Sequence, residues 1–481
     1  MNPVNPINRR NLLRSLGCGF GHLAATALAS HSSAQAASPL GSTVNPLASR
    51  ASHFPAKAKR VIFVFMQGGP SHVDTFDYKP ILEKRDGELE TFDDARVLAK
   101  TKEIVEHRIF QSPWKFKQYG DSGQHVSELF PNIAKQVDNV CFLKGMHTDG
   151  VAHGPATLFL HTGSINLVRP SIGSWVLYGL GSENENLPGF ITLQPSMGNG
   201  GPRNYNNAFL PSIYQGTALG RAGGAATNIT LKNIANSKWN PNQQQHQLEV
   251  LRQLNQQQAA RHTGTDEFDA VLNSYELAWR MQMTAPGLLE IDDEPEHIQA
   301  MYGIGKKPTD NFGRQCLMAR RLCEAGVRFV QVNYGDNSNN PRWDQHSNLE
   351  KHAEHAMNTD QPVAGLIADL KQRGLLEDTL IWWGGEFGRT PYAQANGTGR
   401  DHNPDGFTIF AAGAGLKPGF SFGETDEFGH HAVQGKVHMH DWHATVLHLL
   451  GLDHEKLTFR HDGRDFRLTD VHGEVVREIM T

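Results

Sequence analysis

Residues 379–412 read TLIWWGGEFGRTPYAQANGTGRDHNPDGFTIFAA, and this stretch is predicted to lie at the centre of the protein. It begins with Thr379–Trp383, a short apolar run rich in β-branched and aromatic residues, which is typical of a buried strand. Two glycines end that run, and a second apolar run at Phe407–Ala412 predicts another strand. In open α/β sheets, ligands bind beyond the carboxyl ends of the strands, so we expect a site in the loop between these runs.

This loop carries four charged or titratable side chains. Glu386 and Arg389 closely follow the first strand, and Asp401 and His402 precede the second. Glycines beside these residues let the backbone and a ligand approach closely, which favours a functional site. The alternative is structural: a Glu–Arg pair and a buried Asp–His pair would simply tie the loop down.

Three further apolar runs are also followed by polar groups. They are Val61–Met66, Asn139–Leu143 and Val327–Tyr334, and each is predicted to be a strand. A mixed set of carboxylates and imidazoles fits Zn²⁺, Mn²⁺ or Fe, and its repetition at strand ends favours a metal site over isolated His–Asp pairs. The polar groups that follow these runs are Ser71, His72 and Asp74, then His147, Asp149 and His153, then Asp344 and His346.

The alternation of strand, loop and helix across at least four strands predicts an α/β fold. We expect a mostly parallel sheet with helices on both faces. Gly313–Ala325 and about Leu349–Arg373 are predicted to be helices, and a glycine follows each of them. Residues from about 196 to 305 form a loop-rich and helical insertion, because the first part has few periodic apolar residues and the later part has helical spacing.

Composition narrows the function classes. The chain has 481 residues, of which 38% are hydrophobic and 20% charged, and its net charge of −5 gives no reason to expect a nucleic acid or an anionic membrane as partner. An oxidoreductase is a distant third choice, because Gly68-Gly69-Pro70 lacks the third glycine of a dinucleotide-binding loop. The three cysteines after residue 37 are too few for a disulfide framework, and Cys316 and Cys323 are predicted to pack in a core.

The first 37 residues resemble an export signal. Asn8–Arg14 reads NRRNLLR, a modest apolar stretch follows, and Ala34-Gln35-Ala36 is a candidate cleavage site, which together predict twin-arginine export. The apolar stretch is too short and too rich in glycine and alanine for a stable membrane span. Residues 38–58 are then a linker, and the mature protein is expected in the periplasm or outside the cell. A disordered tail with a chance arginine pair is the alternative.

Three groups of motifs together resemble a family of bacterial secreted proteins. They are VIFVFMQGGPSHVDTFD at 61–77, WDQH at 343–346, and LIWWGGEFGRTP with GRDHNP within 380–404. The family is the domain-of-unknown-function family numbered 1501, regarded as related to sulfatases within the alkaline phosphatase superfamily. The resemblance covers roughly 57–475. It implies one sulfatase-like three-layer domain over 59–475, with a short tail at 476–481.

The motifs also depart from those of sulfatases. Sulfatases have a Cys/Ser-x-Pro-x-Arg nucleophile motif, and here His153 stands where the nucleophile is expected and Thr157 where the arginine is expected. Gln67 stands in place of the first acid, and Glu386-Phe387 in place of an Asp-His pair. No cysteine is available there for conversion to formylglycine. A different nucleophile, such as a metal-activated water or Ser71, is therefore needed.

The sequence and the resemblance together predict a secreted metal-dependent hydrolase of sulfate or phosphate esters. Its substrate would be an anionic ester, such as a sulfated polysaccharide. Arg389 would contact the anion, and His153 would act as general acid or base. The rival is a non-catalytic binding or scaffold protein that lost the nucleophile. The predicted ligands of one or two divalent ions (Zn, Mn, Ca or Mg) are Asp344, His346, Glu386 and His402, with His72 and Asp74 behind them.

Overall fold

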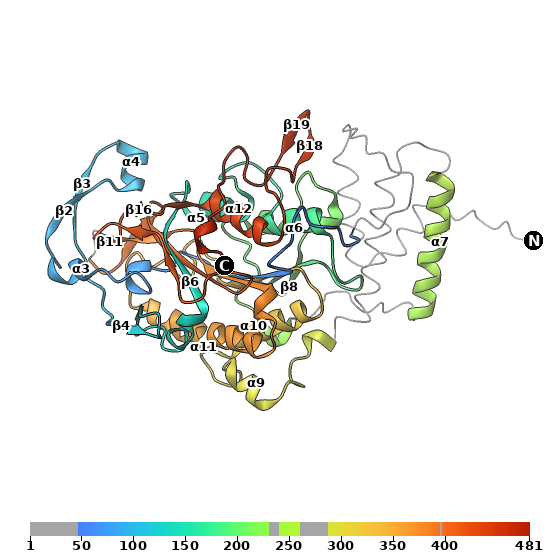
Figure 1. The fold of residues 1–481 in the computed structure, drawn as a ribbon, viewed down its shortest axis with the longest axis horizontal. Helices are drawn as coiled ribbons and strands as arrows, with labels where there is room; N and C mark the ends of the chain where they lie inside the picture. Colours follow the sequence, from blue (N-terminus) through green and yellow to red (C-terminus); the bar gives the residue numbers. More distant parts are fainter. Residues whose placement is uncertain (1–46, 230–239, 260–286, 395–396) are drawn as a thin grey trace, which may run out of the picture.

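The computed structural model describes residues 47–229, 240–259, 287–394 and 397–481 (Figure 1). The predicted export signal lies outside the described residues, and so does the first part of the predicted linker. The same holds for residues 230–239 and 260–286 of the predicted insertion.

Among the described residues, nine strands form one central sheet in the order β14-β6-β13-β10-β1-β9-β7-β8, with β17 also paired to β6. All pairings are parallel except those of β13, which runs antiparallel to both β10 and β6. The sheet is therefore mostly parallel, as predicted. The strands are β1 (Arg60–Met66), β6 (Val140–His147), β7 (Phe190–Leu193), β8 (Thr217–Leu219), β9 (Phe329–Tyr334), β10 (Thr379–Gly384), β13 (Phe407–Ala412), β14 (Ser421–Phe422) and β17 (Val437–His438).

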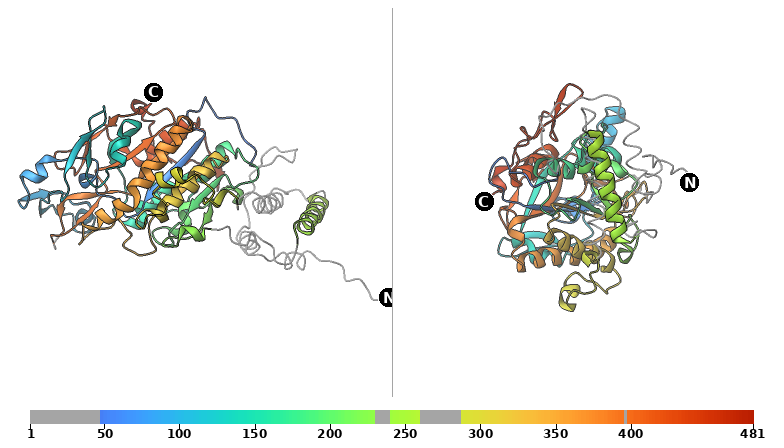
Figure 2. Two further views of the ribbon diagram at one scale, coloured as in Figure 1. Left: turned by 90° about the horizontal axis from the view of Figure 1, so that it is seen from below. Right: turned by 90° about the vertical axis from the view of Figure 1, so that its right-hand side faces the viewer.

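Helices cover both faces of this sheet, which confirms the three-layer prediction (Figures 1 and 2). Because side chains alternate along a strand, Ile62 and Val64 of β1 face one layer while Phe63 and Phe65 face the other. The first layer contains α9 (Glu296–Met301), α10 (Asp310–Glu324) and α11 (Lys351–Gln372), and the second contains α5 (His153–Thr162), α6 (Ile172–Leu180) and α12 (Met439–Leu449). Cys316 and Cys323 of α10 are fully buried in the first layer, as predicted.

Short hairpins surround the sheet and were not predicted from the sequence. They matter here because β11–β12 carries site residues and β2–β3 forms a small projection with α4 (Ala95–Thr101). The two-stranded pairs are β2 (Leu89–Phe92) with β3 (Val105–Arg108), β4 (Phe116–Tyr119) with β5 (Gln124–Ser127), β11 (Gly388–Ala393) with β12 (Arg400–Asn403), β15 (Glu424–Thr425) with β16 (Ala432–Gln434), and β18 (Phe459–His461) with β19 (Arg464–Phe466). The helices α3 (Pro80–Lys84) and α7 (Pro241–Ala259) complete the longer elements.

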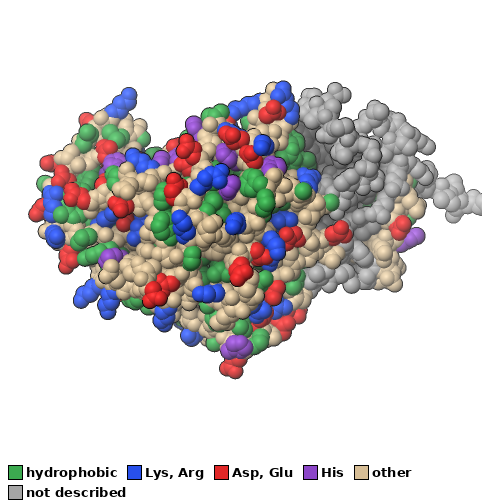
Figure 3. All heavy atoms as spheres, in the orientation of Figure 1, with side chains coloured by type: hydrophobic (Ala, Val, Ile, Leu, Met, Phe, Trp, Pro, Cys, Tyr) green, Lys and Arg blue, Asp and Glu red, His purple; other side chains and the backbone are tan. Residues whose placement is uncertain are grey.

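In the part of the chain that the structure describes, no helix has both the length and the apolar character to cross a bilayer. Figure 3 shows acidic and basic side chains interspersed over the visible face.

Candidate metal centre

Four side chains from three separate segments converge beyond the carboxyl ends of the central strands. His153 begins α5 after β6, Asp344 and His346 lie in the loop after β9, and His402 lies in β12, just before β13. Their ligand atoms all lie within 4.8 Å of one another. Since β6 and β9 run in one direction and β13 in the other, the ends of the first two and the start of the third meet at the same edge.

One carboxylate oxygen is the centre of this cluster. Oδ1 of Asp344 lies 2.8 Å from Nε2 of His346, 3.2 Å from Nε2 of His153 and 3.3 Å from Nε2 of His402. The Nε2 atoms of His346 and His402 are 3.1 Å apart. Three imidazole nitrogens and a carboxylate oxygen that lie this close together are the kinds of ligand atom that zinc and similar ions take in proteins.

Two of the imidazoles are oriented by contacts on their other side. Nδ1 of His153 lies 2.6 Å from Oε1 of Glu386, and Nδ1 of His402 lies 3.0 Å from the carbonyl oxygen of Val151. When each Nδ1–H donates to these acceptors, the lone pair of Nε2 is left for an ion. Glu386 also accepts the backbone N–H of Gly68, at 3.0 and 3.1 Å to its two oxygens. Glu386 was predicted to be a metal ligand. In the structure it contacts Nδ1 of His153, the ring nitrogen that does not face Asp344, and it is not one of the four residues of the cluster.

Burial and nearby charges shift the pKa values of the cluster residues in opposite directions. Burial opposes ionisation of Asp344, but the nearby Arg389 guanidinium and the three histidines outweigh it and hold the pKa of Asp344 well below its usual range. Burial lowers the pKa of His402 to about 4. Burial also favours a lower pKa for His153, but the carboxylates of Asp344 and Glu386 outweigh it and raise the pKa of this histidine.

Arg389 is fully buried beside the cluster, in β11. Its Nη2 lies 2.8 Å from Oδ1 of Asp344, and its Nε donates to the carbonyl of Gly69 at 3.0 Å. The guanidinium also donates to the carbonyls of Gly68 and Arg400. All three nitrogens therefore bond within the protein. In this arrangement Arg389 neutralises Asp344, and its contact with an anionic substrate stays a prediction.

Ser71, His72 and Asp74, like Glu386 and Arg389, are predicted site residues that are not among the four residues of the cluster. The carboxylate of Asp74 pairs with Arg400, with Nε at 2.7 Å and Nη2 at 3.1 Å, and accepts the hydroxyl of Ser71 at 2.5 Å. Nε2 of His72 lies 2.7 Å from the carbonyl oxygen of Gly429. These buried groups hold the β11–β12 hairpin against the loop after β1. Arg400 was not singled out from the sequence, although it lies within the GRDHNP motif.

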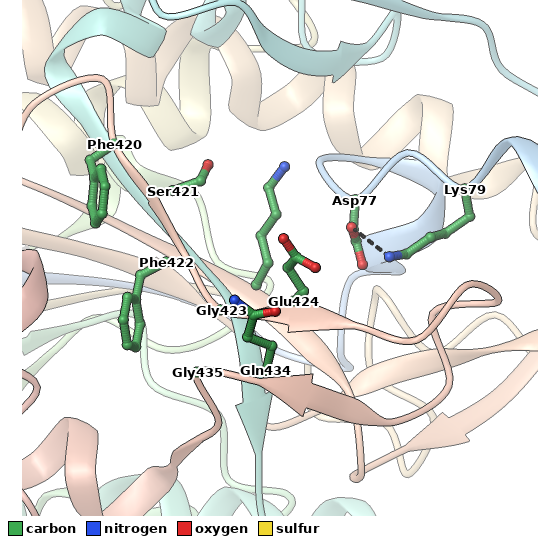
Figure 4. Close-up of a pocket in the computed structure, with 10 residues that line it drawn as sticks. Asp77, Lys79, Phe420, Ser421, Phe422, Gly423, Glu424, Gln434 and Gly435 are labelled. Atoms are coloured by element: carbon green, nitrogen blue, oxygen red, sulfur yellow. Dashed lines mark ion pairs between the residues drawn. The ribbon is translucent and has the colours of Figure 1, made fainter.

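A separate cavity of about 470 Å³ lies beside β6 (Figure 4). Asp77 and Lys79 form an ion pair of 3.3 Å in its lining. None of the lining residues belongs to the metal cluster, so this cavity is not its entrance. The lining residues are Asp77, Lys79, Lys144, Phe420, Ser421, Phe422, Gly423, Glu424, Gln434 and Gly435.

Solved structures with a similar fold include a lipoteichoic acid synthase, a sulfatase and a protein in the alkaline phosphatase superfamily. The lipoteichoic acid synthase LtaP from Listeria monocytogenes is 10% identical, with a TM-score of 0.35 and coverage of 88% of this chain and 78% of that one. The PsFucS1 sulfatase from Pseudoalteromonas sp. is 11% identical, with a TM-score of 0.32 and coverage of 83% of this chain and 68% of that one. A protein in the alkaline phosphatase superfamily from Vibrio parahaemolyticus is 8% identical, with a TM-score of 0.34 and coverage of 93% of this chain and 76% of that one.

Similarity this low leaves the activity of the chain to be judged from its own residues. A search of curated proteins finds no match. A family model does match, over residues 58–480, and its span agrees with the resemblance seen in the motifs. The chain therefore belongs to the family described as "Protein of unknown function (DUF1501)".

Proposed function

We propose that this chain is an exported, metal-dependent hydrolase of sulfate or phosphate esters. The observation that carries the proposal is the set of three Nε2 atoms within 3.3 Å of one oxygen of Asp344. The same arrangement supports a single ion held by His153, Asp344, His346 and His402.

The donor set narrows the identity of the ion. Calcium and magnesium take oxygen ligands, whereas three imidazoles with one carboxylate suit Zn²⁺, Mn²⁺ or Fe. Among the four metals expected from the sequence, zinc and manganese are therefore favoured. In this proposal His153 serves as a ligand rather than as the general acid or base.

The residues of the chain hold and orient the reacting groups. When bound, such an ion supplies a Lewis acid that polarises an ester oxygen and activates water. Glu386 keeps Nε2 of His153 directed at the site, and Arg389 keeps Asp344 ionised. The hydroxyl of Ser71 donates to Asp74, which itself pairs with Arg400, so water is the better nucleophile in this geometry.

The proposed location and substrate rest on the sequence. The arginine pair of Asn8–Arg14 supports twin-arginine export and a periplasmic or extracellular protein. An anionic ester, with sulfated polysaccharide as one class, is the substrate that suits the motif resemblance.

A second candidate function is a non-catalytic binding or scaffold protein with the same metal centre. His153 favours it, because this residue stands at the expected nucleophile position and its two ring nitrogens face Glu386 and Asp344. No cysteine belongs to the described cluster, so it offers no thiol nucleophile.

The two functions are separated by metal analysis and an activity screen on the same protein. His346 has a side chain that is 22% exposed, so His346→Ala removes a ligand with little effect on the core. The exposed His297 of α9 provides the control His297→Ala. We expect His346→Ala to contain about one ion per chain fewer than the control and to lose hydrolysis of 4-nitrophenyl sulfate or phosphate.

Each other outcome is decisive. Loss of the ion without any ester hydrolysis in the parent protein would favour the binding protein. An unchanged metal content in His346→Ala would refute the metal centre itself.

A further inference from the structure

A second cluster of possible ligands lies outside the metal centre, where the β2–β3 projection meets the turn before β16. Oδ1 of Asp93 is 2.7 Å from Nε2 of His431 and 3.3 Å from Nε2 of His430. The three ligand atoms lie within 4.8 Å of one another. No residue is shared with the first cluster.

The backbone turn directs two consecutive histidines to one carboxylate. Side chains next to each other in a strand point to opposite faces, so this arrangement needs a special turn. Asp426 provides it, because its carboxylate accepts the backbone N–H groups of His430 and His431, each at 2.8 Å, and of Phe428 at 3.1 Å. The two imidazole rings consequently lie 4.3 Å apart between centroids. The geometry is set by the fold before any ion binds.

The side chain of His430 is buried, and its ring nitrogens lack hydrogen-bond partners among the described residues. Its side chain is only 4% exposed, and neither ring nitrogen has a hydrogen bond of normal geometry. Leaving a buried polar nitrogen without a partner is unfavourable, and coordination of an ion by Nε2 would remove that cost. Asp93 and His431 have side chains 46% and 37% exposed, so an ion can enter from solvent.

The projection that carries Asp93 has little hydrophobic core of its own. Figure 1 shows β2, β3 and α4 standing at one end of the molecule. None of the residues of α4 is buried, and β2 and β3 pair only with each other. A two-stranded hairpin is marginally stable alone, and small units commonly depend on a metal or a disulfide. Phe92 of β2 belongs to a small hydrophobic cluster whose other buried members are Val73, Leu82, Ile109 and Tyr392.

From these observations we infer that Asp93, His430 and His431 form a structural site for a zinc-class divalent ion, with water as the remaining ligand. The ion clamps the β2–β3 projection to the turn that leads into β16. Two imidazoles, one carboxylate and a water complete the four-coordinate set that zinc prefers. The inference stands whether or not the first cluster is catalytic.

The site also touches the support of the first cluster. Asn403, the residue after His402, donates through its side-chain amide to the carbonyl of His430 at 2.8 Å. An ion that fixes the turn around His430 therefore also steadies the end of β12.

The test uses the mature protein carrying His346→Ala, so that the first cluster does not contribute. We expect about one Zn²⁺ per chain in this variant and none once His431→Gln is added. Lys100 and Lys102 of the projection are exposed trypsin sites. At a zinc concentration about 100 times the Kd, cleavage there should slow about 100-fold in His346→Ala, because the open population falls by that factor. His346→Ala/His431→Gln should show no zinc effect.

His431 is partly exposed, so its replacement leaves the core intact, and Asp93→Asn in the same background provides an independent variant of similar shape. His346→Ala/His297→Ala is the matched control and should keep both the ion and the protection. Absence of zinc in His346→Ala, or zinc that persists in both cluster variants, would overturn the inference.

Discussion

Oε1 of Glu386 lies 2.6 Å from Nδ1 of His153, while Nε2 of the same imidazole lies 3.2 Å from Asp344. The histidine is thus held between an outer and an inner carboxylate. Outer carboxylates of this kind orient a metal-binding imidazole and raise its basicity. The role of Glu386 can therefore be tested apart from that of the proposed ligands.

Glu386→Gln should weaken metal binding without removing a ligand. The amide preserves the shape of the side chain and can still accept the N–H of Gly68, but it no longer carries the charge that faces His153. We expect the Kd for Zn²⁺ to rise about 10- to 100-fold in a competition titration. Glu478→Gln, at an exposed position, should leave the Kd unchanged. An unchanged Kd in Glu386→Gln would show that this contact does not support the centre.

Arg389→Ala should destabilise the metal-free protein strongly. The substitution leaves the buried carboxylate of Asp344 without its guanidinium partner, so the free energy of unfolding should fall by about 3–5 kcal/mol in urea titrations. Arg460 pairs with Asp465 on the surface, with side chains 61% and 57% exposed. Arg460→Ala should therefore cost no more than about 1 kcal/mol. Similar losses in the two variants would contradict the role assigned to Arg389.

Gly68→Ala should disturb the position of Asp344. Gly68 has a φ of +112°, and an added Cβ would lie 2.7 Å from the backbone nitrogens of Trp343 and Asp344. Gly87 has a φ of +82° with nothing within 4 Å of such a Cβ, so Gly87→Ala reproduces the backbone strain without the clash. We expect Gly68→Ala to lower both zinc affinity and thermal stability. Gly87→Ala should lower stability alone, by about 1–3 kcal/mol.

Stability should fall as the pH drops from about 6.5 to about 4, partly through His161. Burial lowers the pKa of His161 to about 4, whereas its ordinary value is 6.5. Below pH 6.5 the unfolded chain binds a proton that the folded protein excludes until about pH 4. The stability linked to His161 is thus fully present above pH 6.5 and is lost in that interval.

His161→Gln should make this loss smaller by about 3 kcal/mol, measured as the difference in free energy of unfolding between pH 7 and pH 4. His297→Gln changes an exposed histidine and should leave the pH dependence as it is. A parallel shift of the whole His161→Gln curve would show only a structural role for the side chain.

The strands at the middle of the sheet were predictable because burial on both faces demands continuous apolar runs. β1, β10 and β13 agree with their predicted bounds to within one residue. Direction was not predictable, since the apolar pattern of β13 is the same whichever way it runs. It is set by pairing with distant residues, such as Ala412 opposite Ile381. β8 was missed because three residues are too few to show a pattern.

The candidate centre was predictable in kind but not in detail. Asp344, His346 and His402 were chosen as ligands from their places after or before strands, and these places do meet at one edge. The spacing of residues along the chain does not, however, give the distances between their side chains in the folded protein. It therefore could not show that Glu386 lies behind His153, or that Arg400 pairs with Asp74 across 326 positions of the sequence.

Because β13 runs against its neighbours, the chain leaves β10 and enters β13 at the same edge of the sheet. Residues 385–406 consequently form an excursion whose two ends are about one strand spacing, roughly 5 Å, apart. No strand of the central sheet lies within the described residues of this excursion, so its path is set by its side-chain contacts and not by the order of the sheet. Glu386, Arg389 and His402 all lie on this excursion and contact His153 or Asp344, so a change in its length or path would move all three relative to the metal cluster together.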